Sequence, residues 1–342
     1  METLVLKPND HSLAMAGNLL RNGEVVAIPT ETVYGLAANA FDGKAVAKIF
    51  QAKGRPMDNP LIVHISDISQ VYDLVSEFPK KAEKLAEHFW AGAITMIMPC
   101  SDKIPKEVTA GLNTVAVRFP SHDIARKIIA CAGVPLAAPS ANLSGSPSPT
   151  SATHVYNDLH GKIPLIIDGG ESTVGVESTV ISMVGDVPTL LRPGGITVEQ
   201  IESVIGKICI DKGVLNQIDN NAVVSSPGMK YKHYSPKANI IIVKCDGDEY
   251  IDYINTLSAK KNIGALCYDE DVDKLTVPSV SLGGKDDFLL QAHNLFDALR
   301  KLDLMNLHTV YARCPKKEGV GLAVYNRLIR SAGFEVIDLE KY

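Results

Sequence analysis

Two cations lie two residues apart in a segment whose backbone is restricted by prolines. Lys53 and Arg55 flank Gly54, and a proline follows both Arg55 and Asn59. Proline fixes its own φ and pushes the preceding residue toward extended conformations. Such a loop suits a polyphosphate, because Arg binds oxygens as a fork and Lys acts as a point charge. The alternative is a solvated surface loop with two ordinary cations.

Hydroxyl groups follow an apolar run at residues 24–29. Thr30 and Thr32 alternate with Glu31 at the end of this predicted strand, where α/β folds place the loops that contact ligands. Two hydroxyls on one face can bind a small polar ligand. Because β-branched residues also suit strand ends, a purely structural role stays open.

Two further polar residues interrupt apolar runs. His64 lies in the run at residues 61–65, where a lone histidine is usually a hydrogen-bonded core residue. Arg118 lies near the end of the run at residues 115–119. A buried arginine needs an anionic partner, which is either a protein carboxylate or a carboxylate or phosphate of the substrate.

Loops rich in small and hydroxyl residues follow the later strands. Ser140 and Asn142 follow one strand, a turn rich in glycine and hydroxyls spans residues 175–180, and Arg192 precedes a proline. Together these loops predict one polar cavity built for an anion. The chain has no GxxxxGK[ST], GxGxxG, HExxH or GxSxG motif. That argues against P-loop kinases, classical dinucleotide enzymes, zincins and serine hydrolases.

The composition is that of a globular protein with two domains. The chain has 342 residues, of which 46% are hydrophobic and 21% are charged, and this length suits two domains. Its apolar runs are too short to span a membrane, and its first residues show no signal peptide. Six scattered cysteines without a CxxC pair favour reduced thiols over disulfides or a zinc site. We therefore expect a cytoplasmic protein.

The charge distribution argues against a protein dedicated to binding nucleic acid. The net charge is −5, with 16 Lys and Arg against 21 Asp and Glu in residues 1–205 and 18 against 18 in the remainder. Neither part has the basic excess typical of nucleic-acid-binding domains. A local basic cleft stays possible, because net charge does not report clustering.

Strand-like and helix-like patterns alternate along the chain and predict an α/β fold. The first part is expected to form a mixed sheet, with strands at 24–29, 61–65, 94–99, 115–119, 136–138, 165–168 and 178–183 and helices at 42–51, 79–89 and 124–131. The last part is expected to form a smaller, Rossmann-like parallel sheet, with strands at 239–245, 263–268, 309–314 and 334–339 and helices at 250–260, 287–302 and 322–332. We predict a catalytic domain at 1–206, a linker at 207–237 and a small α/β domain at 238–342.

The linker carries an unusual cluster of side chains. Tyr231, His233 and Tyr234 lie beside Lys230 and Lys232, and a passive linker requires none of these residues. We interpret the segment as a lid or a docking segment. The alternative is a tail that packs on the surface.

Taken in order, the motifs resemble those of the threonylcarbamoyl-AMP synthase family, the YrdC-like enzymes. The resemblance rests on PTETVYGL, KGRPMDNPL with His64, VAVRFP, APSANLSG, GVESTV and LRPG across roughly residues 5–206. PGMKYKHYSP and the following α/β unit are similar to the longer, two-domain form of the family. The resemblance implies a twisted mixed sheet with helices and a large polar cavity. It also implies a nucleotidyltransferase that makes L-threonylcarbamoyladenylate and pyrophosphate from L-threonine, bicarbonate or CO2, and ATP with Mg²⁺, for transferase proteins that modify tRNA.

Roles for individual residues follow from the same resemblance. Lys53 and Arg55 are expected to be catalytic and to hold the triphosphate. The other ATP-binding residues are expected to be Asn59, Thr114, Ser140, Asn142, Ser148 and Arg192. The threonine-binding residues are expected to be Thr32, His64, Arg118, Ala138 and Ser178. Tyr231, His233 and Tyr234 are expected to form a lid that excludes water, while Mg²⁺ is expected to be held mainly by phosphates and waters.

Two other functions stay open from the residues. One is an RNA-binding module that uses the basic cavity, which would show salt-sensitive RNA binding without any need for threonine. The other is carbamoyl-adenylate chemistry with a different acyl group, as in a related domain of hydrogenase-maturation proteins. The amino-acid pocket, with Thr32, His64, Arg118 and Ser178, distinguishes this second alternative from the synthase.

Overall fold

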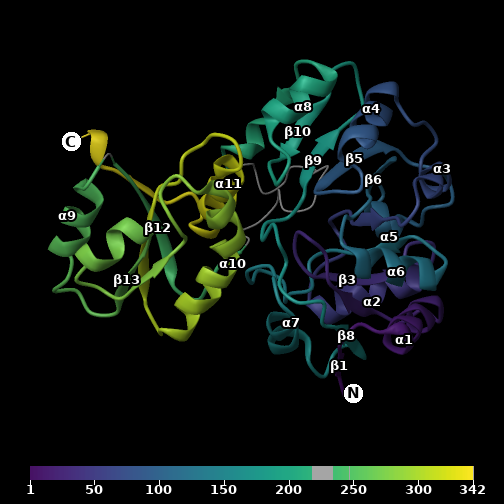
Figure 1. Cartoon of the computed structure of the whole chain (residues 1–342), viewed down its shortest axis with the longest axis horizontal. Coiled ribbons are helices and arrows are strands. Elements are labelled where there is room, and N and C mark those ends of the chain that lie inside the picture. Colours follow the sequence, from purple (N-terminus) through teal and green to yellow (C-terminus); the bar gives the residue numbers. More distant parts are fainter. Residues whose placement is uncertain (218–233, 246, 342) are drawn as a thin grey trace. The chain divides into compact units, whose positions relative to one another are not determined.

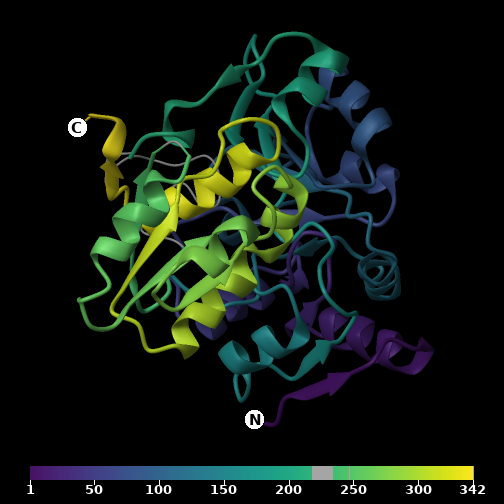
Figure 2. The same ribbon diagram turned by 60° about the vertical axis from the view of Figure 1, so that its left-hand side comes forward.

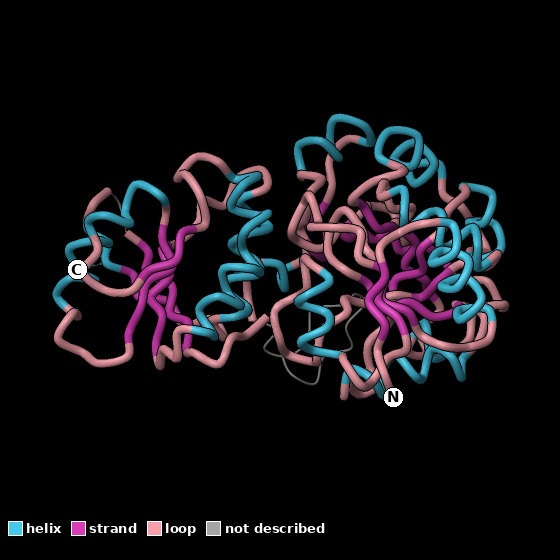
Figure 3. The backbone as a smooth tube through the Cα atoms, turned by 60° about the horizontal axis from the view of Figure 1, so that its bottom comes forward, coloured by secondary structure: helices cyan, strands magenta, loops and turns pink. Residues whose placement is uncertain are grey.

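The chain folds into two compact units. The computed structural model describes residues 1–217, 234–245 and 247–341. Among these residues, the larger unit comprises Met1–Ser144 and Ser148–Val214, and the smaller unit comprises Gly145–Pro147, Leu215–Gln217 and residues 234–341. Each unit has its own sheet with helices around it (Figure 3). The boundaries expected at 206 and 237 stay predictions, because the segment between them lies partly outside the described residues.

The larger unit is built on a mixed sheet, which confirms the fold class expected for it. The described strands have the order β1-β8-β2-β3-β7-β4-β6-β5-β9-β10-β11. They are β1 (Leu4–Leu6), β2 (Val26–Ile28), β3 (Gly35–Asn39), β4 (Ile62–His64), β5 (Ile94–Pro99), β6 (Thr114–Arg118), β7 (Leu136–Ala137), β8 (Leu165–Ile167), β9 (Thr179–Ser182), β10 (Thr189–Arg192) and β11 (Cys209–Ile210). β1 is an edge strand and lies along the margin of this unit (Figure 2).

Helices of the larger unit lie between these strands in the sequence. They are α1 (Asp10–Arg21), α2 (Gly43–Lys53), α3 (Val71–Leu74), α4 (Lys80–Phe89), α5 (Lys106–Thr109), α6 (Asp123–Ala132), α7 (Ala152–Leu159) and α8 (Val198–Ile205). Among the described residues, no helix is long and apolar enough to cross a membrane.

The two faces of this sheet are covered differently. Alternate residues of a strand point to opposite faces. On one face, α1 and α6 pack against β2, β7 and β8 through residues such as Leu20, Ile129 and Ile28. Leu136 belongs to this same cluster and is the cross-strand partner of His64. His64 therefore points to the face that α1 and α6 partly cover, on the neighbouring strands.

The smaller unit is a parallel sheet, as the sequence predicts. Its described strands have the order β14-β13-β15-β12-β16, and every pairing is parallel. They are β12 (Asn239–Lys244), β13 (Ile263–Cys267), β14 (Ser279–Ser281), β15 (Thr309–Arg313) and β16 (Val336–Asp338). Figure 1 shows α9 (Glu249–Thr256) on one face of this sheet and α10 (Phe288–Leu304) and α11 (Gly321–Ser331) on the other.

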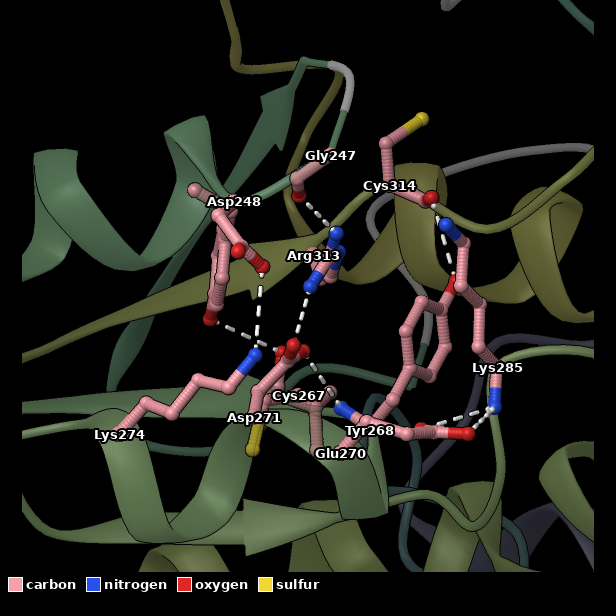
Figure 4. A network of polar contacts seen from close by, with 12 residues as sticks. Gly247, Asp248, Cys267, Tyr268, Glu270, Asp271, Lys274, Lys285, Arg313 and Cys314 are labelled. Carbon is pink, nitrogen blue, oxygen red and sulfur yellow. Dashed lines mark hydrogen bonds and ion pairs between the residues drawn. The ribbon is translucent and has the colours of Figure 1, made fainter.

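A buried ion pair lies at the carboxyl edge of this parallel sheet (Figure 4). Arg313 ends β15 and contacts the carboxylate of Asp271 and the carbonyl of Gly247. The side chains of Arg313 and Asp271 are 8% and 3% exposed. The guanidinium also lies 5.3 Å and 5.4 Å from the ring centroids of Tyr250 and Tyr268. Since the chain itself supplies every one of these partners, we interpret the pair as part of the core of the smaller unit.

The sequence predicted the longer elements and missed several short ones. All strands predicted for the first part are present, the one at 94–99 with the expected ends and the others with shifted ends, but β1, β3, β10 and β11 were not predicted. These strands have two to five residues. They form because they pair with neighbouring strands, and their own sequences show little periodicity. Helix α1 was missed although it carries a capping box between Asn9 and Ser12, which is a signal readable from sequence.

Candidate active site

Three polar side chains lie in a row across the middle of the larger sheet. Arg118 of β6 is the cross-strand partner of His64 on β4 and of Thr95 on β5. Directly paired residues point to the same face, so the three side chains lie side by side on the face described above. The parallel and antiparallel pairing around β6 therefore brings together residues that are far apart in the sequence.

Arg118 is held by the loop that follows β2. One terminal nitrogen, Nη1, donates to Thr32 Oγ1 at 2.7 Å, and the other, Nη2, lies 2.7 Å from Glu31 Oε1. Nε donates to the carbonyl of Gly92 at 3.4 Å. The side chains of Arg118 and Glu31 are only 4% and 9% exposed. Of the two kinds of partner that the sequence left open for Arg118, the structure supplies a protein carboxylate.

The Glu31 carboxylate is ionised in this environment. Burial by itself raises the pKa of Glu31, but the charge and hydrogen bond of the Arg118 guanidinium lower it, and the net pKa lies below the ordinary value. Pairing of this kind is the usual condition under which a carboxylate is buried.

His64 is a neutral imidazole at physiological pH. Its side chain is 4% exposed, and Nδ1 has no hydrogen-bond partner among the described residues. Burial and the nearby charge of Arg118 lower the pKa of His64 to about 3. His64 therefore offers a hydrogen-bonding ring rather than a charge, and it is not the simple core histidine that its apolar run suggests.

The lowered pKa of His64 predicts a pH-dependent stability. Unfolded histidine binds a proton below its ordinary pKa of 6.5, whereas folded His64 does so only below about 3. Stability is therefore lost as pH falls through this window, by about 1.4 kcal/mol per pH unit. Urea unfolding of the chain and of a His64→Gln variant is expected to diverge by about 2 kcal/mol between pH 6.5 and pH 5. Parallel curves for the two proteins would contradict a neutral, buried His64.

The loop around Thr30 is fixed by its own hydroxyl. Thr30 Oγ1 donates to the carbonyl of Val33 at 2.6 Å, accepts from the backbone N–H groups of Thr32 and Val33, and lies 2.9 Å from Thr32 Oγ1. A threonine that bonds its own loop in this way stabilises a tight turn. Thr30 thus orients Thr32 toward Arg118 and has a supporting role.

Backbone hydrogen bonds join three of the predicted ligand loops. Tyr34 N donates to the carbonyl of Pro149, and Ala141 N donates to the carbonyl of Tyr34, each at 2.8 Å. Ser144 N donates to the carbonyl of Lys53 at 3.0 Å. The loops around Thr32, Lys53 and Ser140 therefore form one connected wall, although Thr32 and Ser140 are 108 positions apart in the sequence.

Lys53 lies at the end of α2, and its ammonium points into this wall. It donates to the carbonyls of Ser140 and Asn142, the latter at 2.7 Å, and lies 3.4 Å from Asn142 Oδ1. Gly54 ends the helix with φ +62°, a conformation that favours glycine. Burial and the neighbouring charge of Arg55 lower the pKa of Lys53, whereas Asp158 and Glu177 oppose this shift. Lys53 and Arg55 are thus close in space, as the sequence predicts.

Asn59 and Ser140 were both predicted to bind ATP, and their side chains differ in their partners. The Asn59 side chain is 1% exposed, and its amide nitrogen and oxygen have no partner among the described residues. Buried polar groups without partners are rare in proteins and indicate a place for a ligand or water. Ser140 Oγ donates to Asn142 Oδ1 at 2.5 Å, so Ser140 and Lys53 both fix the same amide.

Ser148 and Arg192, which were predicted to bind ATP, contact residues at the start of β9. Ser148 Oγ donates to Glu177 Oε1 at 2.5 Å, and both residues are buried. Arg192 Nε donates to the carbonyl of Ser178 at 3.1 Å, and its Nη2 donates to Ser178 Oγ at 3.3 Å. Ser178 Oγ also lies 2.7 Å from Thr95 Oγ1, which links this group to the polar row.

A close backbone approach explains the glycine of the LRPG motif. A Cβ atom on Gly194 would lie 2.2 Å from Thr179 N and 2.6 Å from the carbonyl of Glu177. Only glycine fits at such distances. The two motifs GVESTV and LRPG are therefore in contact through their backbones.

Some predicted site residues lie apart from these contacts. Thr114 begins β6, four residues before Arg118, and this corresponds to about 13 Å along the strand. Ala138 is buried, and its backbone N–H donates to the carbonyl of Ile62. Their roles as ligand contacts stay predictions.

The predicted lid is only partly within the described residues. Tyr231 and His233 lie outside them. Tyr234 is 6% exposed, has φ +61° and packs on Phe296 with ring centroids 5.2 Å apart. This contact is within the smaller unit and leaves the lid role of the segment a prediction.

Three residues of the site were missed or passed over in the sequence. Thr95 is one polar residue in the apolar run 94–99. Its position on the face of the sheet that carries Arg118 and His64 is the signal that could have identified it. Glu31 was noted only as a spacer between threonines, and Glu177 only as part of a turn. Their burial and partners become visible only when distant strands are paired.

Family models match nearly the whole chain. Residues 18–194 match the Sua5_yciO_yrdC model, described as telomere recombination. Residues 196–333 match the Sua5_C model, described as the threonylcarbamoyl-AMP synthase C-terminal domain. The second model begins at residue 196, within the domain predicted at 1–206, and it includes the predicted linker and most of the predicted C-terminal domain.

Curated relatives and a solved structure agree with these models. The chain is 50% identical to the threonylcarbamoyl-AMP synthase of Bacillus subtilis, over 97% of this chain and 96% of the relative. It is 46% identical to that of Pyrococcus abyssi, over 95% of each. A crystal structure of P. abyssi Sua5 complexed with L-threonine superposes with a TM-score of 0.92 at 44% identity, covering 99% of this chain and 100% of that one. The chain belongs to the threonylcarbamoyl-AMP synthase family.

Proposed function

We propose that the chain makes threonylcarbamoyl-AMP and pyrophosphate from L-threonine, ATP and bicarbonate or CO2. The observation that carries this proposal is the buried guanidinium of Arg118 beside the hydroxyl of Thr32, in a wall that also contains the Lys53 ammonium. An arginine fork suits an amino-acid carboxylate, and a second group of cations suits a triphosphate. Membership of the family supports the proposal, as does the L-threonine in the P. abyssi structure.

The proposed reaction needs positioning and charge more than a nucleophilic side chain. The amine of threonine forms a bond to the carbon of CO2 and releases a proton, which gives a carbamate. A carbamate oxygen then attacks the α-phosphorus of ATP, the bond to the bridging oxygen of the β-phosphate breaks, and pyrophosphate leaves. Holding both substrates in line and neutralising charge are the main contributions of a protein to such transfers. The enzyme is in this sense a nucleotidyltransferase.

Residues on the two sides of the site are proposed to bind different substrates. Threonine is proposed to contact Arg118, Thr32, His64 and Ser178, with Ala138 at the edge. ATP is proposed to contact Lys53, Arg55, Asn59, Ser140, Asn142, Ser148 and Arg192, with Thr114 as a more distant candidate. The hydrogen bonds from Arg192 to Ser178 join the two sides, so the amino-acid and nucleotide sites are expected to influence each other.

Mg²⁺ is proposed to enter with ATP. Among the described residues, no group of three or more His, Cys, Asp or Glu side chains is arranged to hold a metal ion. Mg²⁺ usually keeps several waters and is held by phosphates and one or two carboxylates. The buried carboxylate of Glu177 is the group on the nucleotide side that would approach it. The ion would neutralise charge on the triphosphate.

The product is proposed to serve tRNA modification. Threonylcarbamoyl-AMP is a mixed anhydride, so a transferase protein that uses tRNA can accept its threonylcarbamoyl group. Closure of the segment with Tyr231, His233 and Tyr234 over the site would protect this labile product from water. This lid stays a prediction.

Pyrophosphate release tests the proposal directly. The purified chain with ATP, Mg²⁺ and bicarbonate is expected to release pyrophosphate only when L-threonine is present, and mass spectrometry is expected to show a new adenylate. Release without threonine would indicate a different acyl group. No release together with tight, salt-sensitive RNA binding would indicate an RNA-binding module.

A further inference from the structure

The contact between Glu31 and Arg118 has no assigned role in the reaction. Glu31 lies between the two threonines of the loop after β2, and its side chain is 9% exposed. Its backbone carbonyl accepts from Val174 N at 2.7 Å, so the residue is anchored at the backbone and at the side chain. A buried carboxylate held in this way fixes the cation that it contacts.

The geometry leaves part of the Arg118 guanidinium available. A guanidinium has five N–H groups, one on Nε and two on each terminal nitrogen. The described hydrogen bonds use one N–H on Nε, to Gly92 O, and one on Nη1, to Thr32 Oγ1. Nη2 lies 2.7 Å from Glu31 Oε1 as an ion pair without hydrogen-bond geometry. At least one N–H group on each terminal nitrogen therefore remains, and two such groups are what a carboxylate needs for bidentate binding.

Glu31 also compensates the positive charge of the Arg118 guanidinium. An unpaired guanidinium at 4% exposure would be strongly disfavoured, because burial removes its hydration. The neighbouring His64 is neutral, so it supplies no compensating charge. Glu31 thus allows Arg118 to remain buried and charged before any substrate arrives.

We propose that Glu31 is a positioning residue for the threonine carboxylate: it holds Arg118 so that the two remaining N–H groups face the substrate. Glu31 acts through Arg118 and does not itself contact threonine. The inference rests on the proposed function, since it assigns the remaining N–H groups to the carboxylate of the amino acid.

A double-mutant cycle on the full chain tests this role. Glu31→Ala is expected to raise the Kd for L-threonine about tenfold or more, with little change in the Kd for ATP. Glu31→Gln keeps an oxygen that accepts from Arg118, so it is expected to raise the Kd for threonine by only about threefold. In an Arg118→Ala background, Glu31→Ala is expected to have no further effect beyond about twofold, because the group through which it acts is gone.

The smaller unit offers a matched control. Asp271 and Arg313 form a buried ion pair of the same kind within the smaller unit (Figure 4). Asp271→Ala is expected to lower thermal stability as Glu31→Ala does, while the Kd for threonine stays within about twofold. If Glu31→Ala does not fold, the cycle is repeated with Glu31→Gln, which keeps the shape of the side chain.

Each outcome decides the inference. Equal losses from Glu31→Ala with and without Arg118 would overturn it, as would an unchanged Kd for threonine or equal losses for threonine and ATP. If Asp271→Ala raised the Kd for threonine as much as Glu31→Ala does, both increases would be explained by lower stability. That result would also overturn the inference. Absence of threonine binding by the unsubstituted chain would overturn the proposed function and this inference together.

Discussion

Replacing Lys53 with methionine is expected to lower the rate of threonine-dependent pyrophosphate release by about 10²- to 10³-fold, the usual cost of removing one preorganised donor or charge at a reacting centre. The substitution keeps an unbranched, flexible side chain one atom shorter than that of lysine, but removes the charge and three N–H donors. The carbonyls of Ser140 and Asn142 would then lose the group that they contact. Both kcat and the KM for ATP are expected to change, because the same ammonium shapes the loop and supplies positive charge near the triphosphate.

Lys48 provides the matched control for this prediction. It lies on the same helix α2, pairs with Glu24 at 2.7 Å, and its side chain is 40% exposed. An exposed ion pair of this kind contributes little to the free energy of folding. Lys48→Met is therefore expected to leave the rate of pyrophosphate release within about twofold of that of the unsubstituted chain. Steady-state kinetics with ATP and threonine varied separately measure both variants. Loss of threonine affinity alone in Lys53→Met, with ATP kinetics intact, would contradict the assignment of Lys53 to the nucleotide side.

Replacing Arg118 with alanine is expected to raise the KM for L-threonine about 10²-fold or more while the KM for ATP changes by less than about threefold. Hydrogen bonds to charged groups are each worth about 1.5–3 kcal/mol, and a bidentate pair contains two of them. Arg118→Lys is expected to raise the KM for threonine nearly as much as Arg118→Ala, because an ammonium lacks the planar fork of the guanidinium. The variant also leaves Glu31 buried without its cation, so lower thermal stability is expected as well.

Arg126 separates a local effect from a general loss of positive charge. It lies on α6 and pairs with Asp123 at the surface, where its side chain is 37% exposed. Arg126→Ala is expected to leave the KM values for both substrates unchanged within about twofold. Equal increases in the two KM values for Arg118→Ala would argue that Arg118 supports the whole site and does not bind the threonine carboxylate.

The predictions for Lys53 and Arg118 differ because the two cations are buried against different partners. Lys53 is buried against carbonyls, and its pKa lies well below the ordinary value because of burial and the nearby Arg55. Arg118 is buried against a carboxylate that neutralises it. Lysine readily changes its charge when buried, whereas arginine keeps it. The proposed nucleotide side is therefore expected to depend on neighbouring charges such as Glu177 and Asp158, and the proposed threonine side on Glu31.

The candidate site residues could be proposed from the sequence because their motifs are local. Two cations around a glycine and between prolines, and hydroxyls after an apolar run, are patterns whose meaning depends on a few neighbouring residues. The fold class and the long elements were also predictable, since strand and helix periodicity is local as well. Resemblance to the family added the order of the motifs along the chain.

The partners of these residues were decided by the tertiary structure alone. Arg118 pairs with Glu31, 87 positions earlier in the sequence, because the loop after β2 reaches β6. Thr95 reaches Ser178 because β5 and β9 are parallel neighbours in the sheet. The Lys53 ammonium donates to Ser140 and Asn142 because their loop meets the end of α2. Strand order and register are set by the packing of the whole sheet, and no short segment of sequence contains that information.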